Sequence, residues 1–147
     1  MAPLIVLVAF TAIARLVGFT AVAALDSWSV ATGIGLAAMF AMTGVAHFVQ
    51  PKRSGLIAIV PPNLPHAPLV VTVSGVLELL GAVGLLVPQT RALAAICLGL
   101  LLIALYPANV YASREKRHPA APRTPLVRRT IYQGIFIAAC VIVVVVK

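Results

Sequence analysis

Residues 74–88 read SGVLELLGAVGLLVP, an apolar run with a single charged residue, Glu78. No lysine or arginine lies within a dozen positions of this carboxylate on either side. A charged side chain at the centre of a bilayer costs about 2.5 kcal/mol or more. An acid in such a run must therefore be protonated or be partnered by a group from another segment.

The direction of Glu78 follows from the residues around it. On a helix, its face is shared by small residues and large aliphatic residues lie opposite. Membrane helices pack closely through small-residue faces, so we expect Glu78 to point into a bundle. Counted from Pro68, Glu78 lies about 15 Å along the helix, near the middle of a ~30 Å apolar core. The small residues are Ser74, Gly75, Gly81 and Ala82, and the aliphatic residues expected to face lipid are Val73, Val76, Leu80 and Val83.

The whole chain shares the character of this run. Of its 147 residues, 62% are hydrophobic and 10% are charged, whereas a soluble domain has about 25% charged residues. A spanning helix needs about 20 mostly apolar residues. We therefore predict an all-α, polytopic membrane helix bundle with five spans, near residues 3–24, 28–49, 68–87, 91–112 and 126–146.

The first run has a second interpretation, as a cleaved signal peptide. The letters AVA at 21–23 are typical of a cleavage site. However, the run begins Met-Ala-Pro without a basic side chain, and Arg15 interrupts its apolar core. We therefore favour a retained transmembrane helix.

The basic residues predict the orientation. There are 11 lysines and arginines against 3 acids, and they gather in short loops, so we read them as topology signals and not as a nucleic-acid surface. The positive-inside rule puts the N-terminus and both basic loops in the cytoplasm and the C-terminus outside. The expected cytoplasmic side holds Lys52, Arg53, Arg114, Lys116, Arg117, Arg123, Arg128 and Arg129, and the other side holds Arg91 and Lys147.

Two loops differ in character. Residues 51–68 combine an apolar centre with five prolines, and GLIAIV within them is too short to span. We expect this segment to form an interfacial or re-entrant cap over one end of the bundle. The basic loop 113–125 reads as a solvated topology determinant, or as a patch for anionic lipid headgroups.

Polar residues cluster toward the same end. Thr43 and His47 are spaced i,i+4, and Tyr106 and Asn109 are spaced i,i+3. Pro107 removes a backbone donor and should bend its helix. With the 51–68 cap, these residues could line a cavity with Glu78 at its floor. Each residue taken alone also has a simpler interpretation. His47 would be a helix cap, Tyr106 an interfacial anchor and Asn109 an interhelical hydrogen-bonding residue.

Arg15 is the candidate partner for Glu78. The first and third spans run in the same direction, and Arg15 lies about 18 Å from Pro3, a depth that matches Glu78 within a turn. We therefore predict a buried Arg15–Glu78 ion pair. Such a pair would either hold the first helix on the bundle or form part of a functional site.

Four segments occur in a recognisable order: GVAHFVQP (44–51), IVPPNLPHAPLV (59–70), SGVLELLGAVGLLVPQTRALAA (74–95) and YPANVYAS (106–113). Over about residues 35–147 this series resembles the DoxX-like (DoxX/DoxD-like) family of small bacterial integral membrane proteins. The resemblance implies a four-helix transmembrane bundle at 28–147, with 1–27 as an extra N-terminal transmembrane helix, in the bacterial cytoplasmic membrane. The positions that match the family's pattern are His47, Pro51, Pro61, Glu78, Gly81, Arg91, Pro107 and Asn109.

The sequence is compatible with two main classes of function and with a weaker third. The first is a non-catalytic membrane subunit, or a bundle that binds a small hydrophobic ligand such as a lipid or a quinone. The alternative, implied by the resemblance, is a small membrane subunit of a quinone-linked or thiol/sulfur oxidoreductase complex, with electrons from a partner protein. Transport by an oligomer is a weaker third class. We expect membrane lipids as partners, a protein partner or a second copy as candidates, quinone as the candidate cofactor, and neither a metal site nor nucleic-acid binding.

Overall fold

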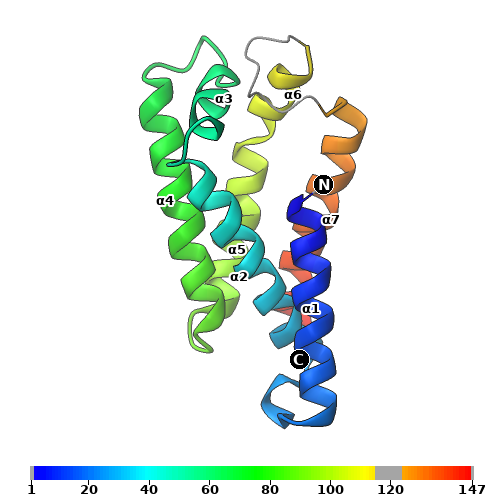
Figure 1. Cartoon of the computed structure of the whole chain (residues 1–147). Helices are drawn as coiled ribbons and strands as arrows, with labels where there is room; N and C mark the ends of the chain where they lie inside the picture. The colour runs from blue at the N-terminus through cyan, green and yellow to red at the C-terminus, as the bar shows by residue number, and fades with distance from the viewer. Residues whose placement is uncertain (1, 115–123, 147) are drawn as a thin grey trace.

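The computed structural model describes residues 2–114 and 124–146, and this part of the chain is helical without strands (Figure 1). The predicted all-α fold is confirmed. Of the predicted basic loop, Lys116, Arg117 and Arg123 lie outside the described residues, as does Lys147. The elements are α1 (Ala2–Thr20), η1 (Ala23–Leu25), α2 (Trp28–Ala46), α3 (Lys52–Ala58), α4 (Ala67–Leu86), α5 (Arg91–Ala104), α6 (Tyr106–Arg114) and α7 (Leu126–Val145).

Four helices close into a ring. Helix α2 packs against α4, α4 against α5, α5 against α7, and α7 against α2, while α1 packs on α2 from outside the ring (Figure 1). Five segments of the described chain are long and apolar enough to cross a membrane: α1, α2, α4, the joined α5–α6 segment and α7. The five predicted spans are confirmed, and the architecture is that of a multi-pass membrane protein.

Helix α4 presents the two faces that its sequence predicts. Ser74, Gly75, Glu78 and Ala82 are buried against the other helices. On the opposite side, the exposed fraction of the residue is 48% for Val73 and 64% for Leu80, and Val76 and Val83 are also exposed. Large aliphatic side chains that protrude in this way are suited to lipid, so the small-residue face of α4 is its packing face.

At the predicted bend, near Pro107, the helix is interrupted for one residue. Helix α5 ends at Ala104 and α6 begins at Tyr106, while Leu105 between them still donates to the Leu101 carbonyl. Proline has no N–H and its ring clashes with the carbonyl four residues earlier, which interrupts the hydrogen-bond ladder here. The side chain of Gln133 compensates in part, because its Nε2 donates to the Leu102 carbonyl at 2.8 Å.

Helix α1 is attached to α2 by a close backbone approach. A Cβ atom built at Gly35 would lie 2.6 Å from the carbonyl oxygen of Leu7 and would also collide with the Thr11 hydroxyl. Glycine at position 35 therefore allows the two helices to touch. Near the other end of α1, Arg15 Nη1 donates to Asp26 Oδ1 at 2.6 Å, and the guanidinium lies 4.8 Å from the centre of the Trp28 ring.

These contacts overturn the predicted Arg15–Glu78 pair. Arg15 pairs with Asp26, whereas Glu78 accepts a hydrogen bond from Thr43 of α2 and lies beside His47. The depth estimate assumed that α1 and α4 begin at the same level. In Figure 1, however, the N-terminus lies part-way down the bundle and α1 extends beyond the other helices at the end where η1 lies. The shift brings Arg15 to the turn before α2, away from the middle of α4.

Gly35→Ala tests the α1–α2 contact. The added methyl group meets a backbone carbonyl that cannot rotate away, so we expect a loss of about 1–3 kcal/mol in the free energy of unfolding. Unfolding in detergent, followed by circular dichroism, measures this loss. Gly134→Ala is the matched control, because no atom lies within 4 Å of a Cβ placed at Gly134. Equal stability of the two variants would contradict the close approach.

Candidate functional site

A cavity of about 960 Å³ lies at the end of the bundle where α3 and α6 are found. Its walls come from α2, α4, α5 and α6, with the segment 59–64 over it and Pro3 of α1 and Phe136 of α7 at its sides. The five residues proposed from the sequence as ligand or proton sites all line it: Thr43, His47, Glu78, Tyr106 and Asn109. The Pro-rich segment thus covers this end of the bundle as predicted.

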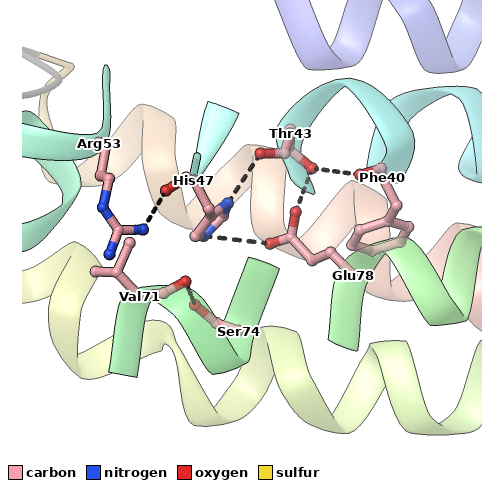
Figure 2. Close-up of polar contacts among 7 residues, drawn as sticks. All are labelled: Phe40, Thr43, His47, Arg53, Val71, Ser74 and Glu78. Carbon is pink, nitrogen blue, oxygen red and sulfur yellow. Dashed lines mark hydrogen bonds and ion pairs between the residues drawn. The ribbon is translucent and has the colours of Figure 1, made fainter. Parts of the chain in front are cut away.

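Glu78 is held by the last turns of α2 (Figure 2). The Thr43 hydroxyl donates to Glu78 Oε2 at 2.5 Å. His47 Nδ1 lies 2.9 Å from the Thr43 carbonyl, and because a carbonyl only accepts, Nδ1 is the donor. The other ring nitrogen, Nε2, therefore faces Glu78, at 3.9 Å from Oε1. The carboxyl group thus lies beside one hydroxyl and one imidazole, and only 6% of the Glu78 residue is exposed.

Two glycines bring these side chains together. A Cβ atom at Gly75 of α4 would lie 2.5 Å from the Cβ of His47, and one at Gly44 of α2 would lie 3.3 Å from the Cβ of Glu78. A larger residue at position 75 would push α2 and α4 apart, because the Cβ of His47 cannot move without its backbone, whereas one at position 44 would first displace the Leu79 side chain. The glycine contacts therefore set the spacing between His47 and Glu78.

Arg53 of α3 fixes the backbone at His47. Its Nη1 donates to the His47 carbonyl at 2.7 Å, and its Nη2 donates to Thr72 Oγ1 of α4 at 2.9 Å. The His47 carbonyl is one of those left without an intrahelical donor at the end of a helix. In the sequence, Arg53 served only to predict the orientation of the loops. Its position in a loop did not indicate that it would bind the end of α2.

Tyr106 and Asn109 line the cavity and also join α6 to α7. Asn109 Nδ2 donates to Gln133 Oε1 at 3.0 Å, and Arg129 Nη1 donates to Asn109 Oδ1 at 3.2 Å. The Tyr106 hydroxyl is 2.8 Å from Thr130 Oγ1. The interpretation of Asn109 as an interhelical hydrogen-bonding residue is confirmed. Arg129 and Gln133 are buried and were missed, although their i,i+4 spacing on one apolar helix was a signal.

The arrangement places a carboxyl group and an imidazole 3.9 Å apart in a buried site. A carboxyl group and an imidazole that share one proton are either both neutral or both charged, and both forms present one donor and one acceptor. Buried ionisable groups in membrane helices commonly mark ligand or proton sites. In the described part of the chain, no three His, Cys, Asp or Glu residues are grouped as metal ligands would be.

Comparison with known proteins places the chain in a family. A family model described as "Domain of unknown function (DUF8561)" matches residues 36–144. The chain belongs to this family. The match begins inside α2 and ends inside α7, so it includes Thr43, His47, Glu78, Tyr106 and Asn109 but not α1. No curated protein and no solved structure matches the chain. The resemblance to the DoxX-like family stays a prediction.

Thr43→Val tests the bond to the buried carboxyl. Valine keeps the shape but removes the hydroxyl donor, and leaving a buried polar group without a partner costs about 1–3 kcal/mol. We expect a loss of that size in the free energy of unfolding in detergent. The loss should shrink when Glu78→Leu is already present, because leucine has no acceptor for the Thr43 hydroxyl and the two residues are coupled.

Thr20→Val is the control for this substitution. The Thr20 hydroxyl is exposed and donates only to the Leu16 carbonyl of its own helix. Exposed substitutions of this kind usually change stability by less than about 0.5 kcal/mol. If Thr43→Val and Thr20→Val change the free energy of unfolding equally, the hydrogen bond between Thr43 and Glu78 does not stabilise the fold.

Proposed function

We propose that this protein is a membrane-embedded binding bundle that holds one small hydrophobic ligand, such as a lipid or a quinone, without catalysing a reaction on its own. The observation that carries the proposal is the cavity of about 960 Å³, whose walls are mostly apolar and which Thr43, His47 and Glu78 line as one connected polar group. Ligand sites in proteins measure about 300–1,000 Å³ and combine apolar walls with a few orienting polar groups.

The position of the cavity supports a ligand that comes from the bilayer. Phe40, Leu102 and Phe136 belong to three of the spanning helices and line it. Pro3, at the start of α1, lines it as well, so the cavity lies against the outermost helix of the bundle. A molecule that enters from the hydrocarbon core would therefore meet walls that are mostly apolar, as its surroundings in the membrane are.

A redox role is the second candidate. Glu78 and His47 face the cavity within 3.9 Å of one another, and reduction of a quinone consumes protons that such a pair can deliver. The DoxX-like resemblance points the same way. In this role the protein is a small membrane subunit, and a partner protein supplies the electrons.

Copurification tests the binding proposal. Protein taken from native membranes in a mild detergent should carry about one ligand per chain in native mass spectrometry. Ala46→Phe should reduce the fraction of chains that carry this mass, because Ala46 lines the cavity and the new ring would occupy part of its volume. Ala138→Phe is the control, because Ala138 is exposed on α7 outside the cavity.

The identity of the extracted molecule separates the two candidates. A stoichiometric quinone would favour the redox subunit, and any other lipid would favour simple binding. Wild-type protein that carries no ligand, in repeated preparations from native membranes, would contradict both.

We also propose a location in the bacterial cytoplasmic membrane, with the N-terminus and basic loops in the cytoplasm and the C-terminus outside. The support is the distribution of lysine and arginine among the loops. Alkaline phosphatase fused to the C-terminus of the full chain should be active, because this enzyme matures only outside the cytoplasm. An inactive phosphatase together with a fluorescent C-terminal green fluorescent protein fusion would reverse the assigned orientation.

A further inference from the structure

His47 and Glu78 line the cavity side by side without a direct hydrogen bond, because Nε2 and Oε1 are 3.9 Å apart. An oxygen atom to one side of the line that joins these two atoms can lie about 2.8 Å from each of them. The remaining hydrogen-bonding atoms of both side chains are engaged, since Nδ1 donates to the Thr43 carbonyl and Oε2 accepts from the Thr43 hydroxyl (Figure 2).

A hydroxyl group is the ligand group that matches this pair. In an apolar interior a pair without net charge costs least, and such a pair has one proton between Nε2 and Oε1. It therefore presents one donor and one acceptor, whichever residue holds the proton. A hydroxyl donates one hydrogen bond and accepts another, so it satisfies both forms. A carboxylate would need two donors from the pair, and an ammonium group would need two acceptors.

The charge of the cavity wall also disfavours an anionic headgroup. No lysine or arginine is among the described residues that line the cavity. Arg53 lies outside the lining, and its guanidinium is bound to the His47 carbonyl and to Thr72. Carboxylate and phosphate groups are bound most strongly by cationic donors, which these walls do not offer.

We infer that the ligand is a neutral amphiphile with a hydroxyl as its polar group, seated between His47 Nε2 and Glu78 Oε1. Its apolar chain lies against Phe40, Leu102 and Phe136. This inference rests on the proposed binding function and adds the chemical class of the ligand. It covers long-chain alcohols and phenols and excludes carboxylate anions, ammonium amphiphiles and phospholipids.

Competition among molecules of equal chain length tests the inference. Full-length protein in phosphatidylcholine nanodiscs is loaded with tritiated dodecanol. Unlabelled dodecanol, dodecanoate, dodecylamine and dodecane then compete at equal mole fractions in the bilayer. We expect dodecanol to compete at least about tenfold better than the other three, because one hydrogen bond to a charged or shared-proton group is worth about that factor.

Two variants connect this preference to the site. His47→Phe removes Nε2 and Glu78→Leu removes Oε1, and either one that gives a monodisperse protein should reduce the preference for dodecanol over dodecane to less than about twofold. Ser29→Ala is the control. Ser29 lies on α2 at the opposite end of the bundle, where its hydroxyl donates to the Val143 carbonyl, and its loss should leave the preference unchanged.

The possible results of this experiment distinguish the hydroxyl assignment from the proposed binding function. Equal competition by all four molecules would overturn the hydroxyl assignment and leave the binding function standing. A preference for dodecylamine would overturn it by showing that the pair carries a net negative charge, and a preference for dodecanoate would do so by showing a net positive charge. A last result is that dodecanol shows no saturable binding and that each of the other three molecules, labelled in its turn, shows none either. That result would reject both the hydroxyl assignment and the proposed binding function.

Discussion

The close contact of α2 and α4 at Gly44 and Gly75 is the constraint on which the rest of the site depends. Because neither residue has a side chain, the two helices approach until His47 and Glu78 stand side by side. Thr43 then reaches the carboxyl group with its hydroxyl. A carboxyl group in the apolar interior is expensive without hydrogen-bonding partners, and this crossing supplies the Thr43 hydroxyl and places the His47 imidazole beside it. The cavity lies at this end of α2.

The fold could be predicted from the sequence almost entirely, because each spanning helix is a long apolar run with few charges. The inward direction of Glu78 followed from the small residues spaced around it. The gathering of Thr43, His47, Tyr106 and Asn109 around one cavity followed from their helical spacing and from their shared position near one end of the spans. These are local properties, which helix geometry alone determines.

The failures concern relations between helices. The rise along a helix gave comparable depths for Arg15 and Glu78, but it contains no information on how far α1 is shifted along α2 or on which helices are neighbours. Asp26 could have been considered as the partner of Arg15, since it lies in the turn that follows. Arg129 was counted with the loop charges, although it is buried beside Asn109. A basic residue in the first turn of a span is compatible with both positions, and packing decides between them.

The interruption at Leu105 has a consequence for the shape of the cavity. Helix α6 is not continuous with α5, and its described polar contacts run sideways to α7 through Tyr106 and Asn109. Leu105 still donates to the Leu101 carbonyl and accepts from the Asn109 N–H, so the two helices remain one span with a local irregularity. The wall of the cavity that α6 supplies is therefore positioned from two sides, by the chain of α5 and by the side chains of α7. A change on α7, which lines the cavity only through Phe136 among the described residues, would reach the cavity through this wall.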